Sequence, residues 1–340
     1  MTIGALMFAE MAEQSGSLRR SAGDRHEVAR RVQALAPSLA GITLTARGSS
    51  ANASAFGRIA LGIATRRPVT TEPMSLAAAY GVGQLPTNWL SIVSSQSGRT
   101  PEIVEAAHHA KALGASTVAL TNDRSSPLAA MADLTLHLAV GSERAVPATK
   151  TFTAQLATFL HIAEAYDPHF GFTDDAWDVL ADEVDDALTD DAQLATVRDL
   201  TSGSTAMFVT GRGFGFAIAR EGALKIKEAG RIPCEALSHL EFLHGPIAVT
   251  GPDIPTLVVA LRGPTEPAAE QVVSELRRRG VPHAVVGNTA GADLVVGPDL
   301  PEPLAAIAVA VRLQQLARVA ALDRGVDPDR TDDLSKVTLT

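Results

Sequence analysis

The sequence predicts an α/β protein with two tandem doubly wound domains, each built on a parallel sheet. Short apolar runs rich in Val, Ile, Leu and Thr alternate with helical patterns, and this plan occurs twice along the 340 residues. A polar, Asp-rich stretch at 173–195 separates the two occurrences. Strands that alternate with long helices pair in parallel and are covered on both faces, so both halves are expected to form the same kind of sheet.

The first half contains four predicted strands, which lie at 42–46, 89–95, 116–122 and 133–139. Helical patterns are found at 51–65, 101–113 and 151–165. The sequence Gly48-Ser49-Ser50 joins the first strand to its helix, and Gly98 marks the turn after the second strand.

The second half repeats this order. Its predicted strands lie at 205–211, 255–263, 281–287 and 292–297, and its predicted helices lie at 216–229, 265–279 and 302–323. The whole chain is expected to divide into a helical lead-in over 1–25, a first domain over 26–170, a connector over 171–195, a second domain over 196–326 and a tail over 327–340.

The composition is typical of a packed globular protein, with 46% hydrophobic and 20% charged residues. A net charge of −9 (29 − 38) argues against nucleic acid or an anionic membrane as the main partner. Cys234 is the single cysteine, which excludes an intrachain disulfide and a thiolate zinc site. Residues 1–20 lack a leader pattern, and 304–322 contains Arg and Gln, so we expect a buried helix there. These features predict a cytoplasmic protein without a metal or cofactor.

Two hydroxyl-rich sequences follow predicted strands and could bind phosphate. Ser95-Gln96-Ser97-Gly98-Arg99-Thr100 precedes one helix, and Gly48-Ser49-Ser50 precedes another. Free N–H groups at a helix start favour an anion, and hydroxyls add further donors. The alternative is helix capping, which is the favoured interpretation of either motif taken alone. Two such loops on neighbouring strands favour phosphate binding.

The segment EGALKIKE at 221–228 is the main candidate for acid–base chemistry. Helical spacing places Glu221, Lys225 and Glu228 on one face. A solvated ion-pair face is the alternative. The segment follows a predicted strand and a Gly-Arg-Gly turn, where sites at sheet ends are found, and His244 lies downstream before a Gly-Pro turn. Carboxylates, a lysine and a histidine can together move protons at carbon and oxygen.

Two lysines outside this segment have ambiguous contexts. Lys150 lies in Ala148-Thr149-Lys150-Thr151 at a helix start, where the segment could cap the helix or contact an anion. Lys336 lies in the polar end segment TDDLSKVTLT, which on its own predicts a frayed chain end.

Several motifs, in this order, resemble those of the SIS (sugar isomerase) family. They are Met11-Ala12-Glu13-Gln14, RGSS at 47–50, SQSGRT at 95–100, ATKTFT at 148–153, EGALKIKE at 221–228, His244-Gly245-Pro246 and Asp333-Leu334-Ser335-Lys336. The chain is similar to the isomerase half of glucosamine-6-phosphate synthase, which has two such domains, and to its stand-alone relatives. The resemblance runs nearly from end to end and implies flavodoxin-like domains with a tail over the active site.

The resemblance also implies catalytic roles. Glu228 would be the base that moves a proton between C1 and C2 of the sugar, and Lys225 and Glu221 would support proton transfers at its oxygens. His244 would assist ring opening from a neighbouring subunit, which implies a homodimer. Lys336 would reach the site from the tail, where its family counterpart can form an imine with the open-chain sugar. Contacts with the phosphate and sugar are implied for Gly48, Ser49, Ser50, Ser95, Gln96, Ser97, Thr100, Val146 and Ala148.

The sequence departs from the synthase at several points. Residue 2 is Thr2 where the synthase glutaminase has its nucleophilic cysteine, and no glutaminase-sized segment precedes the motifs. Arg99 replaces an acidic residue, and Ala148 replaces a serine that contacts the sugar. SQSGRTP at 95–101 and Glu143-Arg144-Ala145-Val146 resemble stand-alone deaminases. We therefore expect conversion of glucosamine 6-phosphate and water to fructose 6-phosphate and ammonia.

Two alternatives stay open. The first is isomerase or deaminase activity on another amino- or ketose-phosphate. The second is a non-catalytic phosphosugar sensor, because SIS domains also serve as effector-binding modules in regulators. Such regulators generally add a basic helix-turn-helix segment, which this sequence does not show. The joint presence of Glu228, His244 and Lys336 favours catalysis.

Overall fold

The computed structural model of the protein describes residues 3–71, 74–82, 88–330 and 336. Contacts group the chain into two compact units that are discontinuous in sequence. Unit A comprises Ser17–Glu143, Ala154–Asp174 and Ser335–Thr340, and unit B comprises Met1–Gly16, Arg144–Thr153 and Asp175–Leu334. Each unit contains one five-stranded sheet in which every described strand pair is parallel, so the predicted α/β class with two parallel sheets is confirmed.

Unit A has the strand order β2-β1-β3-β4-β5. Its strands are β1 (Gly41–Ala46), β2 (Val69–Thr71), β3 (Trp89–Ser94), β4 (Ser116–Thr121) and β5 (Leu134–His137). Its helices are α3 (Gly48–Thr65), α4 (Met74–Tyr80), α5 (Pro101–Ala112), α6 (Pro127–Met131) and the short η1 (Pro168–Phe170). The helices α2 (Gln14–Leu35) and α7 (Lys150–Glu164) contribute residues to both units.

Unit B has the strand order β10-β9-β8-β6-β7. Its strands are β6 (Met207–Gly211), β7 (Cys234–Ser238), β8 (Thr256–Ala260), β9 (His283–Gly287) and β10 (Leu294–Val295). Its helices are α1 (Ala5–Ala12), α8 (Asp174–Thr189), α9 (Asp191–Ser202), α10 (Phe214–Gly230), α11 (His239–Leu243), η2 (Pro246–Val249), α12 (Glu266–Arg279) and α13 (Glu302–Asp323). The elements β2, α4, α6, β7 and α11 are additional to those predicted from the sequence.

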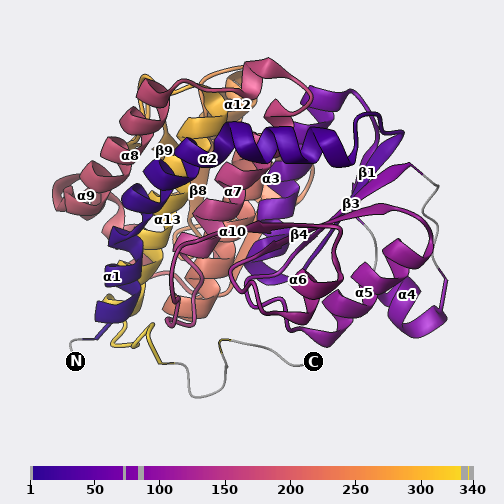
Figure 1. The fold of residues 1–340 in the computed structure, drawn as a ribbon. Coiled ribbons are helices and arrows are strands. Elements are labelled where there is room, and N and C mark those ends of the chain that lie inside the picture. The colour runs from indigo at the N-terminus through magenta and orange to yellow at the C-terminus, as the bar shows by residue number, and fades with distance from the viewer. Residues whose placement is uncertain (1–2, 72–73, 83–87, 331–335, 337–340) are drawn as a thin grey trace. The chain divides into compact units, whose positions relative to one another are not determined.

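The register of β1 and β3 aligns the two loops that were predicted to bind phosphate. Ala46 at the end of β1 is opposite Ser94 at the end of β3. The polypeptide therefore leaves both strands at the same level, and the starts of α3 and α5 lie at the same edge of the sheet. Figure 1 shows α4, α5 and α6 gathered on one side of this sheet. Beneath them, Val93 and Ala119 of the sheet pack against Ile103 of α5.

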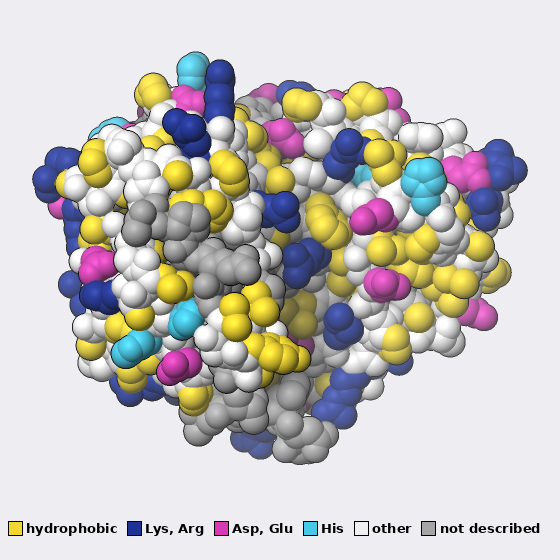
Figure 2. All heavy atoms as spheres, turned by 90° about the vertical axis from the view of Figure 1, so that its right-hand side faces the viewer, with side chains coloured by type: hydrophobic (Ala, Val, Ile, Leu, Met, Phe, Trp, Pro, Cys, Tyr) yellow, Lys and Arg dark blue, Asp and Glu magenta, His cyan; other side chains and the backbone are white. Residues whose placement is uncertain are grey.

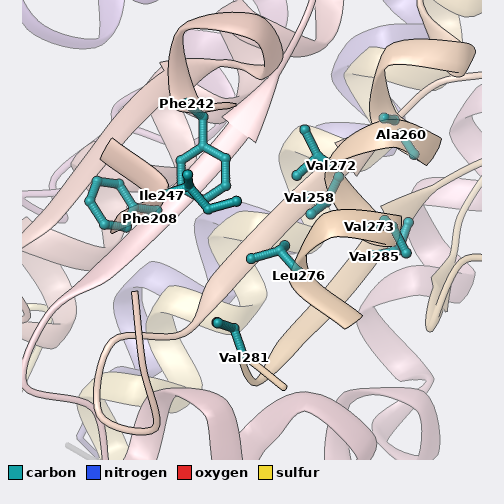
Figure 3. Packing of buried hydrophobic residues seen from close by; sticks show 11 residues of the cluster. Phe208, Phe242, Ile247, Val258, Ala260, Val272, Val273, Leu276, Val281 and Val285 are labelled. Atoms are coloured by element: carbon teal, nitrogen blue, oxygen red, sulfur yellow. The ribbon is translucent and has the colours of Figure 1, made fainter. Parts of the chain in front are cut away.

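Helices cover both faces of the sheet in unit B. On one face, α11 and α12 pack over β6, β8 and β9 through the apolar cluster drawn in Figure 3. Phe208 and Phe242 meet there at a centroid distance of 5.5 Å and a tilt of 59°, which is a favourable aromatic arrangement. On the other face α10 packs against α13, and Gly222 permits the close approach because a Cβ there would lie 2.6 Å from Leu313 Cδ1.

The helix α13 is the central helix of unit B. It is long and apolar enough to cross a membrane by length and composition alone, but 89% of that window is buried inside the protein. The predicted buried helix at this position is therefore confirmed. Near its end, Arg318 donates to the Gly4 carbonyl and lies over the ring of Phe8 in α1, 4.9 Å from the centroid.

Charged side chains of both signs occur on the surface drawn in Figure 2, among hydrophobic and neutral ones. Several form local ion pairs along helices, such as Arg278 with Glu275 and Arg30 with Glu27. Exposed pairs of this kind stabilise a fold by only ~0–1 kcal/mol each. These local pairs therefore contribute little to the stability of the fold.

Candidate functional site

The two candidate phosphate loops of unit A lead into helices without side-chain caps. Arg47 precedes α3 and Thr100 precedes α5, and neither residue caps its helix with a side-chain hydrogen bond. The capping interpretation of these motifs is therefore wrong for the described residues. At α3 the N–H groups of Gly48, Ser49 and Ser50 precede the first helical donor, Ala51, and can meet an anion. In the first turn of α5, Pro101 has no N–H and the Ile103 N–H donates to the Thr100 carbonyl, so this turn offers the Glu102 N–H. The helix dipoles favour negative charge at both helix starts.

Gly48, Ser49 and Ser50 form the first turn of α3, so they lie inside the helix and not in a loop before it. Gly48 takes a left-handed φ of 55° and is exposed, whereas Ser50 is buried. The Ser50 hydroxyl accepts a hydrogen bond of 3.0 Å from the amide nitrogen of Gln155 in α7. Gln155 thus fixes the orientation of Ser50, a contact that sequence analysis did not predict because the two residues are 105 positions apart.

The segment Ser95–Thr100 forms a tight turn between β3 and α5. The Gly98 N–H donates to the Ser95 hydroxyl at 3.1 Å, and the Arg99 N–H donates to the Ser97 hydroxyl at 3.3 Å. Both hydroxyls act as acceptors within the loop, and each still carries an O–H that can donate to a ligand. Gln96 and Ser97 are half-buried. The loop is thus ordered before any ligand binds. This order lowers the free-energy cost of arranging the loop when an anion binds.

Lys336 is ordered by an ion pair and belongs to unit A. Its ammonium lies 2.8 Å from a carboxylate oxygen of Glu143, whose side chain is fully buried. The remainder of the predicted tail over 331–340 lies outside the described residues. A frayed end was the prediction from the residues alone, and for Lys336 that prediction is wrong.

In unit B, Lys225 lies between two carboxylates of α10. Its Nζ is 3.5 Å from Glu221 Oε1 and also pairs with Glu228 Oε2. The predicted common face of Glu221, Lys225 and Glu228 is therefore confirmed. The solvated-face alternative is wrong, because only 1–2% of the Glu221 and Lys225 side chains is exposed. Glu228 remains 26% exposed, so it is the carboxylate of this group that a ligand can reach.

Glu228 lies near the carboxyl end of α10, away from the turn that joins β6 to this helix. The fourteen steps from Phe214 to Glu228 correspond to about 21 Å of helix at 1.5 Å per residue. The sequence argument that placed EGALKIKE at the sheet end where α10 begins is therefore wrong. The carboxylate instead lies close to the chain reversal at Gly230 and Arg231 that leads into β7.

His244 follows α11 and is exposed. Among the described residues, no hydrogen bond or ion pair joins His244 to Glu228. The neighbouring apolar side chains of Leu240 and Val249 are 36% and 60% exposed. Val146 and Ala148 lie in the segment Arg144–Thr153 of unit B and are half-buried.

Lys150 is buried at the start of α7 and pairs with Glu13 at 2.6 Å. The same segment is held by Glu10, whose carboxylate accepts hydrogen bonds from the backbone N–H groups of Arg144 and Ala145 at 2.5 and 3.1 Å. These contacts position the backbone at Val146. They give Lys150 a structural role, and the alternative of an anion contact by this lysine has no support in this geometry.

The structure thus places the candidate residues in two sets. Unit A contains the phosphate-loop residues and Lys336, and unit B contains Glu221, Lys225, Glu228, His244, Val146 and Ala148. Glu143 and Gln155 are partners of site residues that the sequence did not predict. Glu143 was visible only as part of a family-like sequence, because its partner is 193 positions away.

Comparison with known proteins agrees with this arrangement. The family model described as SIS domain matches residues 40–165 and 202–303. The glutamine–fructose-6-phosphate aminotransferase (isomerizing) of Pyrococcus horikoshii is 30% identical over 339 residues, which cover 97% of this chain and 57% of that protein. The chain therefore spans a little over half the length of this relative.

Two solved structures share the fold. The C-terminal domain of glucosamine-fructose-6-phosphate aminotransferase from Francisella tularensis has a TM-score of 0.77 and 23% identity, over 96% of this chain and 98% of that one. Glucosamine-6-phosphate deaminase from Thermotoga maritima has a TM-score of 0.75 and 21% identity, over 94% and 98% of the two chains. At these identities the likeness concerns the fold alone.

Proposed function

Because this chain belongs to the SIS domain family, we propose that it is a phosphosugar isomerase, and that its specific reaction is the deamination of glucosamine 6-phosphate. Glucosamine 6-phosphate and water would give fructose 6-phosphate and ammonia. The observation that carries this proposal is the buried Lys225 between Glu221 and Glu228, with Glu228 alone exposed to a ligand.

The phosphate is held by the starts of α3 and α5. The N–H groups at the start of α3 and the Glu102 N–H of α5, together with the hydroxyls of Ser50, Ser95, Ser97 and Thr100, supply donors without a lysine at the phosphate. Such a site recognises a phosphate on any compact sugar. The sugar itself is selected by other contacts, for which Val146 and Ala148 are the candidates.

Glu228 is the general base. After ring opening the substrate is a 2-amino aldehyde, and Glu228 removes the proton from C2 and delivers one to C1. The C1 aldehyde becomes an alcohol and C2 becomes an imine carbon. Water then adds to C2 and ammonia leaves, which gives fructose 6-phosphate. Lys225 fixes the carboxylate of Glu228 through its ion pair, so the base needs little reorganisation at the moment of transfer.

The direct test is to incubate purified protein with glucosamine 6-phosphate and to measure ammonia and fructose 6-phosphate. Glu228→Gln should lower the rate by ~10²–10⁴-fold, the usual contribution of a general base. Glu235→Gln is the matched control, because Glu235 is an exposed glutamate of the adjacent strand β7. Product formation that is equal in the wild type and in Glu228→Gln would refute the assignment.

The substrate panel separates the specific proposal from the general one. Galactosamine 6-phosphate and ketose 6-phosphates are offered beside glucosamine 6-phosphate. A site that pairs a particular hydroxyl or amine rejects the wrong sugar by ~10⁴-fold or more, because buried polar groups are then left unpaired. If another sugar phosphate is converted and glucosamine 6-phosphate is not, the isomerase assignment stands and the proposed substrate is wrong.

We propose further that the active form is a homodimer in which each subunit receives His244 from the other. The exposure of His244 and of the apolar Leu240 and Val249 beside it supports this proposal. Co-expression of Glu228→Gln and His244→Ala chains tests it. Mixed dimers would contain one intact site and should regain activity that neither variant has alone. Activity that stays at the level of the separate variants would contradict the exchange.

A further inference from the structure

The phosphate loop at Ser95–Thr100 is tied at two points to the end of β4 and the turn that follows it. At one point, the Thr121 hydroxyl donates to the Gln96 carbonyl at 3.2 Å, and the Asn122 N–H donates to the same carbonyl at 3.0 Å. At the other point, Arg99 reaches Asp123. The loop is therefore held on both sides of Gly98, whose φ is 60°.

The second tie, between Arg99 and Asp123, consists of several hydrogen bonds that fix its geometry. Arg99 Nε and Nη2 both donate to Asp123 Oδ2, at 3.1 and 2.7 Å, and Nη2 also donates to the Ser125 hydroxyl at 3.3 Å. Asp123 Oδ1 accepts from the N–H and the hydroxyl of Ser125 at 2.8 and 2.6 Å. Each oxygen of the carboxylate thus has its own set of donors. Hydrogen bonds from Ser125 and from Arg99 lower the pKa of Asp123 to about 2, so the carboxylate is ionised at neutral pH.

We propose that Asp123 is a positioning residue, which holds the Arg99 side chain and thereby sets the backbone of the phosphate loop. The inference rests on the proposed function, since it assumes that this loop binds the phosphate. The Arg99 N–H donates to the Ser97 hydroxyl, and the next residue, Thr100, directly precedes α5, so a fixed Arg99 fixes the donors on both sides. The Arg99 guanidinium pairs with Asp123 and not with the phosphate, which is bound by N–H and hydroxyl donors.

The alternative is that Arg99 binds the phosphate directly as a cation. The two cases predict opposite effects of removing the Asp123 charge. If Asp123 positions the loop, its loss weakens phosphate binding. If Arg99 is a direct ligand, release from Asp123 leaves the cation free and binding is unchanged or tighter. An exposed ion pair contributes little to the free energy of unfolding, so neither variant is expected to unfold the protein.

The experiment compares Asp123→Asn, Arg99→Lys and the double variant with the wild type. The readouts are KM and kcat with glucosamine 6-phosphate, the inhibition constant of inorganic phosphate, and the Kd of fructose 6-phosphate by calorimetry. Asp133→Asn is the matched control, because Asp133 has the same 32% side-chain exposure and pairs with Lys111 at 2.7 Å near the start of β4. Ser97→Ala and Thr100→Val test the phosphate loop itself.

We expect Asp123→Asn to raise KM and the phosphate inhibition constant together by roughly tenfold, which is the lower range for loss of a charge-assisted hydrogen bond, while kcat changes little. Arg99→Lys keeps the charge but loses the fork, and it should match Asp123→Asn. The double variant should be no worse than either single one. Asp133→Asn should behave as the wild type.

Unchanged or tighter phosphate binding in Asp123→Asn would overturn the positioning role. A KM and a phosphate inhibition constant that change little in Arg99→Lys would also overturn it. Additive losses of phosphate affinity in the double variant would likewise overturn the positioning role. If Ser97→Ala and Thr100→Val also leave KM, Kd and the phosphate inhibition constant unchanged, the phosphate loop of the proposed function is wrong as well. A wild type that binds no fructose 6-phosphate would overturn both.

Discussion

The ammonium of Lys336 lies 2.8 Å from the carboxylate of Glu143, although 193 positions separate the two residues in the sequence. The Glu143 side chain is fully buried and the Lys336 side chain is 19% exposed. The ion pair therefore joins a cation near the surface to a carboxylate in the interior of unit A. A charge-assisted contact of this kind orders the lysine and defines its direction.

Removal of the carboxylate charge should release Lys336. In Glu143→Gln we expect trypsin to cleave after Lys336 up to about tenfold faster, the lower range for loss of a hydrogen bond to a charged group. Mass spectrometry of the digestion products measures this rate. Glu102→Gln serves as the control, because Glu102 pairs with Arg47 elsewhere in unit A. Equal cleavage rates in both variants would show that the pair does not order Lys336.

Replacement of Lys225 by Met should destabilise the protein strongly. The change leaves the buried Glu221 without its cation, and breaking a buried pair on one side typically costs about 3–5 kcal/mol. Urea unfolding measures the loss, and Glu221→Gln/Lys225→Met should recover part of it. Arg278→Met, at the exposed pair of Arg278 with Glu275, should cost no more than ~1 kcal/mol. A loss for Lys225→Met as small as this would contradict the burial argument.

Gly98→Ala should damage the phosphate loop. The left-handed φ of 60° already disfavours alanine, and a Cβ at this position would lie 2.3 Å from the Ser126 hydroxyl. The KM for glucosamine 6-phosphate should rise by up to about 10²-fold, the scale for a misplacement of ~1 Å. Gly141→Ala is the control, since Gly141 has a φ of 71° but no heavy atom within 4 Å of the added carbon. Similar KM values in the two variants would mean that the steric contact is unimportant.

The stability of the protein should fall as the pH decreases below 6.5. Burial, together with the charges of Arg25 and His26, lowers the pKa of His161 from 6.5 to about 3. The unfolded chain takes up this proton below pH 6.5 and the folded chain does not. The contribution of His161 is therefore complete above pH 6.5 and is lost towards pH 3, by about 1.4 kcal/mol per pH unit.

His161→Gln should reduce this slope. The glutamine amide can still bond to Ser21, whose hydroxyl lies 2.9 Å from the His161 ring, but it does not titrate. Urea unfolding of both proteins between pH 6.5 and about 4 measures the two slopes. His239, with a pKa lowered to about 4 by burial, contributes in the same sense and should leave a residual slope in the variant. Identical slopes would exclude His161 as a source.

The sheets were predictable because their central strands are strongly apolar and regularly spaced. Runs such as WLSIVSS are buried on both faces in a parallel sheet, where hydrophobic residues predominate. The edge strand β7 was missed because its sequence CEALS is half-exposed, and β2 was missed because it contains only three residues. At a sheet edge, pairing depends on the neighbouring strand more than on the residues themselves.

Helical spacing predicted which side chains of α10 share a face, but it did not predict their burial. Lys225 and Glu221 are buried because α10 packs against α13, and α13 lies about 80 residues further along the chain. The pairing of Lys336 with Glu143 had no local signal at all. Local periodicity specifies elements, whereas long-range contacts depend on the complete fold.

The packing of α1 against α13 sets an order of events on the ribosome. Met7 and Met11 of α1 are fully buried in the finished protein, and Arg318 of α13 covers Phe8. Roughly 300 residues are translated between these helices, which takes about 15–60 s at 5–20 residues per second. During that interval α13 has not yet been synthesised, so the apolar side chains of α1 are exposed on the nascent chain. We expect them to need shielding from aggregation until unit B folds.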